Sequence, residues 1–248
     1  RPTVPEDAAD MPGLTMDFAF IGSGQGFIDD ENEAGAIILA VYDETAGAGL
    51  WLMLPDKSIS DYVINAVARW IDQLGHSSVK IQSSNSMVRG MIGDRIQIAR
   101  VGRTTIMLPS NPAYQSRREV DNFVRNMEGQ TRVTMFEVGL RYGRTVTCQH
   151  AIFPWLVRAV GYLRAHLYID VTGPSAIYDV LQEEVRQQIL PFGETVLFRI
   201  GDEKVSKSLK IKRHHSGDHT WHRGIYLGRT DDGHGHLVST CLLYTSDA

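Results

Sequence analysis

The first quarter of the chain alternates short apolar runs with turn-forming residues. Apolar runs at 14–21, 36–42 and 50–54 predict three strands, and the turn at 44–49 between the last two favours an antiparallel meander. The glycine-rich segment 22–26 is superficially similar to a phosphate-binding loop, but acidic residues follow it where such a loop needs a helix. A hairpin turn is therefore the favoured interpretation.

Helical spacing begins at Ser60. Apolar positions in 60–74 recur every three to four residues, with Ser60 as the N-cap and Gly75 as the stop, which predicts an amphipathic helix. A strand at 79–82 follows, and a strand reached through a crossover helix is expected to lie parallel within the same sheet. The other elements predicted for this part are a short helix at 87–100, a strand at 104–108, and helices from 119 onward and over 150–166. Trp70 and Trp155 occupy apolar helix faces, so both are predicted to be core residues.

The pattern changes after Gly173-Pro174. Short strand candidates at 194–200, 208–212, 224–227 and 236–239 predict a small β-rich module. We therefore expect a linker at 1–13, a core domain at 14–170, a second linker at 171–190 and the module at 191–240. Residues 241–248 depart abruptly from this pattern, look like appended adapter sequence, and are excluded from the fold.

With 248 residues, of which 43% are hydrophobic and 22% charged, the chain can bury a sizeable core. No apolar run approaches the roughly 18 residues that cross a bilayer, and the amino end has no signal-peptide pattern. These features predict a soluble fragment of a longer protein, with no membrane partner. Cys148 and Cys241 form neither a disulfide framework nor a paired zinc motif, which suits a reducing compartment.

The net charge of −4 conceals an uneven distribution. Residues 1–50 hold one basic and ten acidic side chains, a charge of −9, so the other 198 residues carry +5. Between Arg199 and Arg223, seven Lys or Arg side chains accompany three acids. Such a basic segment can neutralise phosphates even on an acidic protein, although composition alone is equally compatible with a solvated edge.

One carboxylate interrupts the first apolar run. Asp17 lies between Met16 and Phe18 in a segment that is otherwise almost wholly apolar. An ionised Asp on a core strand is costly unless it sits at an edge, pairs with a cation or binds a metal ion. The placement of Asp17 therefore favours a metal-ligand role over a structural one.

Several phrases of the sequence carry a family resemblance through their number and order. They are MDFAFI (16–21), IQSSN (81–85), PAYQS (112–116) leading to EVDNF (119–123), FPWLV (153–157), FGETVL (192–197) and WHRGIYLG (221–228). Together they resemble the integrases of Copia-type retrotransposons, which have the retroviral-type integrase catalytic core of the RNase H-like superfamily. The resemblance implies an α/β fold: a mixed five-stranded sheet flanked by helices, here followed by a small β-rich module.

Integrases of this kind use two Asp and one Glu to hold two Mg²⁺ or Mn²⁺ ions, because phosphodiester transfer needs cations on the attacking and leaving oxygens. By the resemblance, Asp17 matches the first carboxylate, Ser84 stands at the second Asp, and Asp121 matches the final Glu, with 36 residues between the last two. Ser84 offers a neutral hydroxyl in place of a charged ligand. Asp17 and Asp121 remain as expected metal ligands, and metal binding and catalysis are expected to be impaired.

Other residues compete for these roles. Glu119 replaces Asp121 if the alignment shifts, while Asp43 and Asp94 could stand in for the missing Asp but are better interpreted as a turn acid near Gly47 and a solvated helix end. Four histidines form the other candidate group. His214, His215, His219 and His222 could bind zinc, but Ser216-Gly217-Asp218 opposes a helix and cysteine partners are missing, which favours a polar loop.

The resemblance implies DNA integration, with element ends and target DNA as partners, a homo-oligomer, and an intracellular location in the nucleus or a cytoplasmic retroelement particle. The side chains expected to contact nucleic acid are Lys207, Lys210, Lys212, Arg213, Arg117 and Arg118. The alternative is a non-catalytic nucleic-acid-binding module of the same fold, decayed or co-opted. A third hypothesis is an RNase H that acts on RNA in hybrids.

Overall fold

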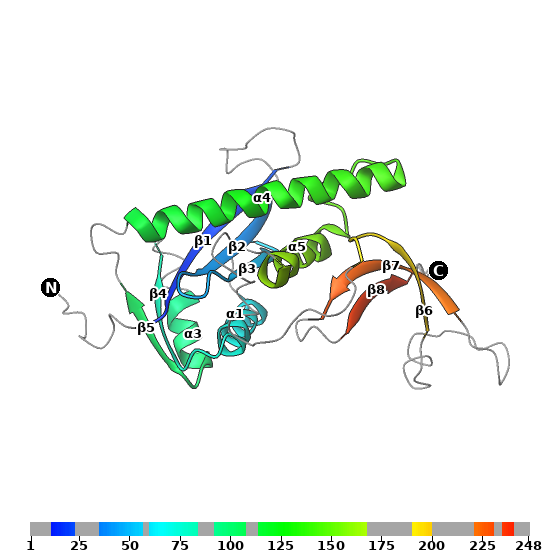
Figure 1. Cartoon of the computed structure of the whole chain (residues 1–248). Coiled ribbons are helices and arrows are strands. Elements are labelled where there is room, and N and C mark those ends of the chain that lie inside the picture. The colour runs from blue at the N-terminus through cyan, green and yellow to red at the C-terminus, as the bar shows by residue number, and fades with distance from the viewer. Residues whose placement is uncertain are drawn as a thin grey trace. The chain divides into compact units, whose positions relative to one another are not determined.

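The computed structural model describes residues 11–22, 35–56, 60–83, 92–107, 114–167, 190–199, 221–230 and 235–240. The chain divides into two compact units, Arg1–Gln187 and Gln188–Ala248, and each is described by itself. Figure 1 labels the helices and strands of both. The predicted strand at 208–212 and residues 241–248 lie outside the described residues, as do nearly all of the predicted turn at 22–26 and linker at 171–190.

The first unit contains a five-stranded sheet of order β3-β2-β1-β4-β5. Its strands are β1 (Gly13–Ile21), β2 (Ala36–Asp43), β3 (Gly49–Leu54), β4 (Ser78–Gln82) and β5 (Arg103–Met107). The first three pair antiparallel, while β4 runs parallel to β1 and to β5. This confirms the predicted fold class, a mixed five-stranded sheet flanked by helices.

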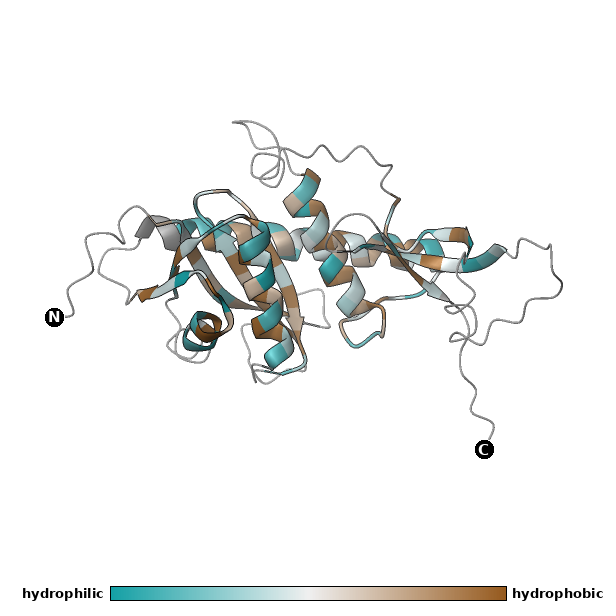
Figure 2. Cartoon of the chain, turned by 90° about the horizontal axis from the view of Figure 1, so that it is seen from below, coloured by the Kyte–Doolittle hydropathy of each residue, from teal (hydrophilic) through white to brown (hydrophobic). Residues whose placement is uncertain are grey.

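One face of this sheet carries the main hydrophobic core. Leu14 and Met16 of β1 and Leu39 and Val41 of β2 are fully buried there. Helices α1 (Asp61–Gln73) and α3 (Asp94–Ala99) supply the other side of the same core. Figure 2 shows helices of this unit banded in brown and teal, as expected for amphipathic helices that bury one side.

The boundaries of α1 follow the predicted signals. Ser60 is the N-cap with extended backbone, although its side chain makes no capping hydrogen bond. The helix ends at Gln73, and Gly75 just beyond its C-cap adopts φ +76°, a left-handed conformation that costs glycine little. Trp70 is 7% exposed and belongs to the core, as predicted.

The second face of the sheet is covered by α4 (Tyr114–Tyr142) and α5 (Phe153–Leu167). Helix α4 packs on β1 and β2, and α5 packs on β3 and against α4. A Cβ added at Gly161 of α5 would lie 3.2 Å from the Cβ of Trp51 on β3. Glycine at this position therefore allows the close approach of α5 to the sheet.

Helix α4 extends well beyond the apolar stretch that predicted it. Its inward-facing positions continue as Thr131 and Thr134, which are buried although polar. Their hydroxyls donate to the carbonyls of Met127 (2.7 Å) and Gln130 (2.9 Å), so the helix satisfies them internally. Gly143 at φ +62° ends the helix. No described helix, α4 included, is long and apolar enough to cross a bilayer.

The second unit contains a three-stranded antiparallel sheet of order β6-β7-β8. Its strands are β6 (Thr195–Arg199), β7 (Trp221–Arg229) and β8 (His236–Thr240). Strand β7 begins three residues before the predicted 224–227 and ends two residues after it. The small β-rich module predicted after the core domain is thus present.

Candidate functional site

Asp17 lies on the face of the sheet that α4 covers. Its neighbour Met16 is in the core beneath α1, and Phe18 packs against that core. Because successive side chains of a strand point to opposite faces, Thr15 and Asp17 point to the α4 side. Helix α4, which carries Asp121, packs on β1 and β2 at this face. Asp17 and the helix bearing its predicted partner therefore share one side of the sheet.

The immediate surroundings of Asp17 are compatible with a ligand role. The residue is half-buried on the middle strand of the five. Its Oδ1 accepts a hydrogen bond from the backbone N–H of Phe18 at 2.9 Å. Partial exposure and a fixed carboxylate are both features that suit binding of a hard cation.

The two candidates for the third carboxylate flank a buried residue in α4. Val120 is 2% exposed, Asp121 is half-buried and Glu119 is exposed. Residues two positions apart in a helix point in directions about 200° apart around its axis. Asp121 and Glu119 therefore extend to opposite flanks of α4, and only one of them can approach a given point on the sheet.

A polar group that the sequence did not reveal lies on the same face as Asp17. Glu44, just after β2, accepts a hydrogen bond from the Thr15 hydroxyl at 2.5 Å. A Cβ added at Gly13 would lie 2.8 Å from Glu44 Oε2 and 3.3 Å from Lys80 Cε. Thr15, Glu44 and Lys80 thus gather beside Gly13, at the start of β1. The only sequence signal was that Glu44 continues the alternation of β2 after Tyr42.

The first turns of α4 approach this polar group. Partial burial raises the pKa of Glu119 above its usual value, and the carboxylate of Glu44 raises it further. Such an effect requires the two carboxylates to be near each other. The start of α4 therefore lies near Glu44, and Asp121 lies on the opposite flank of the helix from Glu119.

Glu119→Gln is expected to stabilise the protein at neutral pH. A carboxyl group whose pKa is raised by folding binds its proton more tightly in the folded state. As the pH rises above the usual pKa of 4.5, ionisation of this group therefore lowers the free energy of unfolding. The variant lacks this cost at pH 7, and its advantage disappears below about pH 4. Urea unfolding at both pH values measures the difference.

Glu137→Gln is the matched control, because Glu137 is an exposed glutamate of the same helix. It is expected to change stability less than Glu119→Gln at pH 7. Equal stability of Glu119→Gln and the parent chain at pH 7 would contradict the raised pKa of Glu119.

The acids considered as substitutes for the missing Asp lie on the wrong side of the sheet. Asp43 is fully buried, and its Oδ1 accepts hydrogen bonds from the backbone N–H groups of Thr45 and Ala46. Its Oδ2 lies 2.5 Å from Nε2 of His76, just beyond α1. Asp94 is the exposed first residue of α3. The turn and helix-end interpretations are confirmed.

The structure describes only some of the remaining predicted site residues. Arg118 is exposed on α4, whereas the side chain of Arg117 lies outside the described residues. Also outside them are Ser84, Lys207, Lys210, Lys212, Arg213, His214, His215 and His219. Within the described part of the chain, no three His, Cys, Asp or Glu side chains converge on a possible metal position.

Two aromatic residues correct or extend the prediction. Trp155 is 41% exposed, so the prediction that it belongs to the core is wrong. Phe153, Leu156 and Val157 are buried instead, and they turn Trp155 outward in the first turn of α5. His222, predicted in the histidine group, is half-buried on β7 with its ring 5.8 Å from that of Phe198.

Comparison with known proteins identifies no sequence relative: no protein-family model and no curated protein matches this chain. Among solved structures, it is similar to the catalytic core domain of BIV integrase, with a TM-score of 0.44 and 14% identity over 68% of this chain and 93% of that one. The HTLV-2 integrase catalytic core domain, solved with magnesium, gives a TM-score of 0.42 and 9% identity over 68% and 94%. A simian T-cell lymphotropic virus intasome gives a TM-score of 0.43 and 11% identity, over 93% of this chain and 79% of that one. Likeness at this level assigns no activity or residue role to this chain.

Proposed function

We propose that this chain is the integrase-like domain of a Copia-type retroelement, that it acts on nucleic acid, and that its strand-transfer activity is impaired at position 84. One observation carries the proposal: a half-buried Asp17 on the middle strand of an RNase H-like sheet, on the face where α4 brings Asp121. Element ends and target DNA would be the substrates, and a homo-oligomer in the nucleus or a retroelement particle follows from that role.

The pairing of β1 with β4 supports the assignment of Ser84. Thr15 pairs with Gln82 in the parallel register. Asp17 and Ser84 each follow these residues by two positions in the sequence. Two residues that follow a parallel pair by the same number of positions are expected at the same edge of the sheet. This counting supports position 84 as the second site residue, opposite Asp17.

The donor set fits a weakened divalent-cation site. Asp17 and Asp121 would hold Mg²⁺ or Mn²⁺, which prefer carboxylate and water oxygens, and Ser84 adds no charge. A bound cation would supply positive charge to the reacting phosphodiester. The chain's own residues contribute position: β1 fixes Asp17, and the packing of α4 against β1 and β2 fixes Asp121. The protein is thus built to orient a phosphodiester but carries too few charged ligands.

Ser84→Asp is expected to raise strand transfer at least ~10-fold over the parent chain, which equals about 1.4 kcal/mol in the barrier. The added carboxylate restores the missing charged ligand. The assay uses double-stranded oligonucleotides that mimic an element end, with Mg²⁺ and with Mn²⁺. Ser60→Asp adds the same charge at an exposed helix cap and is the matched control.

Asp17→Asn in the Ser84→Asp background should abolish the gain, because it removes the first ligand. A folded Ser84→Asp chain with no gain would contradict the catalytic part of the proposal. Salt-dependent DNA binding without product would then favour the alternative, a non-catalytic binding module. Cleavage of an RNA–DNA hybrid in preference to DNA would favour an RNase H.

A further inference from the structure

The three-stranded sheet of the second unit exposes large apolar side chains on one of its faces. Along β6 the exposure alternates, so that Thr195, Leu197 and Arg199 are exposed while Val196 and Phe198 are half-buried. On β7, Trp221 and Arg223 are exposed at the start of the strand. Trp221 is 60% exposed and Leu197 is 67% exposed. One face of the sheet therefore presents an indole and an isobutyl group to solvent.

The strand register places two arginines beside Trp221. Arg199 of β6 pairs directly with Trp221 of β7, and Leu197 pairs with Arg223. Side chains of directly opposed antiparallel residues have Cβ atoms about 5 Å apart, and residues i and i+2 share a face. Trp221 thus has one guanidinium across the ladder and another two residues along its own strand. We call Leu197, Arg199, Trp221 and Arg223 the Trp-Arg face.

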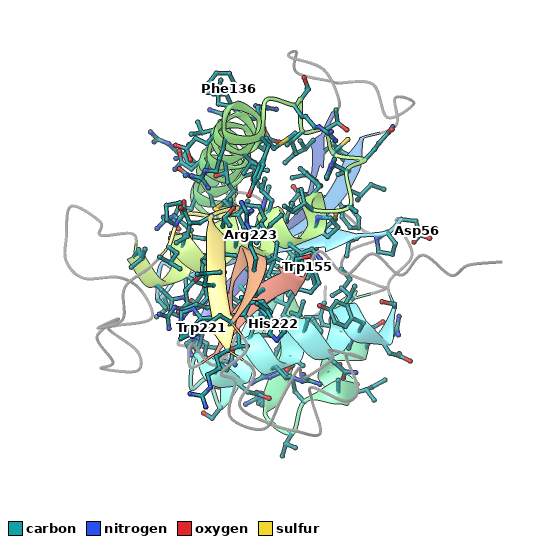
Figure 3. The ribbon with its side chains drawn as sticks, turned by 90° about the vertical axis from the view of Figure 1, so that its right-hand side faces the viewer. Asp56, Phe136, Trp155, Trp221, His222 and Arg223 are labelled. Atoms are coloured by element: carbon teal, nitrogen blue, oxygen red, sulfur yellow. The ribbon has the colours of Figure 1, made fainter. Side chains whose placement is uncertain are left out.

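The two faces of this sheet differ in exposure. On the opposite face Phe198 and His222 are half-buried neighbours across the ladder, with their rings centred 5.8 Å apart. A Cβ added at Gly224 would lie 2.4 Å from Val238 Cγ1 and 3.0 Å from Phe198 Cε1. The side chains of that face contact one another, and the Trp-Arg face is the more exposed of the two. Figure 3 labels Trp221, His222 and Arg223 on β7.

The chemistry of the Trp-Arg face matches an anionic partner with flat aromatic groups. It carries two cations, and none of its four side chains is acidic. Arginines beside an exposed indole are typical of surfaces that hold phosphates while bases stack on the ring. In a duplex the bases are already stacked and paired, so only an unpaired base can lie flat on Trp221. A single strand satisfies the indole and both guanidinium groups together.

We propose that the Trp-Arg face binds single-stranded nucleic acid, with an unpaired base stacked on Trp221 and neighbouring phosphates on Arg199 and Arg223. The proposal rests on the proposed function, because it assumes that the chain acts on nucleic acid. It adds a substrate class, the unpaired strand, and residues that the basic-segment hypothesis left out.

The test measures binding of the full chain to a fluorescent oligothymidylate and to a mixed-sequence duplex of equal length. Trp221→Ala should weaken oligothymidylate binding about 5- to 150-fold, the range found for loss of one stacked base. Duplex binding should change less than about twofold. Trp221→Phe should retain most of the affinity, because a phenyl ring still stacks. Trp155→Ala, which removes the exposed tryptophan of α5, is the matched control and should change neither affinity.

The salt dependence of binding tests the roles of Arg199 and Arg223. Replacing Arg199 and Arg223 with Gln should reduce the slope of log K against log salt for oligothymidylate by about 1.4, or about 0.7 for each phosphate that is no longer neutralised. An unchanged slope would overturn their assignment to phosphates.

The remaining outcomes separate this proposal from the proposed function. Unchanged oligothymidylate binding by Trp221→Ala, or an equal loss for the duplex, would overturn the stacking site while leaving a nucleic-acid domain. No binding of either DNA by the parent chain would overturn the proposed function and the stacking site with it. Loss of concentration-dependent self-association in Trp221→Ala, with DNA binding intact, would assign the face to a second copy of the chain. Near-ultraviolet circular dichroism confirms that each variant is folded.

Discussion

Phe123→Ala is expected to lower the free energy of unfolding by about 3–5 kcal/mol. Phe123 is 2% exposed, and it anchors α4 on the sheet. Its ring centroid lies 5.4 Å from that of Tyr42 and 6.2 Å from that of Trp51, the latter edge-on. The ring covers Gly49 so closely that an added Cβ there would lie 2.1 Å from Phe123 Cε2. Removing the ring leaves a cavity among three residues that cannot collapse without moving the helix.

Phe136→Ala is the matched control, on the same helix and with the same change of side chain. Phe136 is 66% exposed and points away from the rest of the first unit in Figure 3. Its loss should change stability by less than about 0.5 kcal/mol. Urea unfolding followed by circular dichroism measures both variants. Equal losses for the two would contradict the packing of the Phe123 ring on β2 and β3.

The strands and α1 were predictable because their patterns are local. An apolar run bounded by turn residues fixes a strand within one residue at either end, as for β1 and β4. The periodicity of α1 and its flanking Ser60 and Gly75 fix that helix. The almost wholly apolar run of β1 also identified Asp17 as the polar exception. These signals need no knowledge of partners distant in the sequence.

The errors arise where the pattern is ambiguous. The segment that forms α5 is apolar at nearly every position of its first two turns, so periodicity does not choose which residues face inward, and Trp155 was assigned to the core. No end was predicted for helix α4, because the buried Thr131 and Thr134 interrupt its apolar positions. The start of β7 was missed because Trp221, His222 and Arg223 resemble a polar loop, since the face they share is exposed.

The polar group beside Gly13 could not be derived from the sequence. Thr15 and Glu44 are 29 positions apart, and their contact depends on the register of β1 with β2. The approach of Glu119 depends in addition on how α4 crosses the sheet. Such contacts are set by tertiary packing, whereas the site pattern of Asp17, Ser84 and Asp121 came from resemblance and stays a prediction.

Asp43→Ala is the second substitution with a large expected effect, a loss of about 3–5 kcal/mol. The Asp43 side chain is fully buried, and its two oxygens serve three partners. Oδ1 accepts the N–H groups of Thr45 (2.8 Å) and Ala46 (3.1 Å), and Oδ2 bonds to His76 Nε2 at 2.5 Å. Alanine leaves these buried groups without their acceptor, which costs more than the hydrogen bonds contributed. The turn after β2 and the segment after α1 should loosen together.

Asp61→Ala and Asp43→Asn separate the causes of that loss. Asp61 pairs with Arg95 at 2.5 Å, but its side chain is 93% exposed, so removing it should cost less than about 1 kcal/mol. Asparagine at position 43 keeps the volume and one acceptor oxygen. The loss of stability in Asp43→Asn should therefore fall between the losses in Asp61→Ala and Asp43→Ala. Thermal and urea unfolding at pH 7 give the order. If Asp43→Asn lowered stability as much as Asp43→Ala, the negative charge of Asp43 would matter more than its hydrogen bonds to the turn. The turn would then not be the main source of the stability that Asp43 contributes.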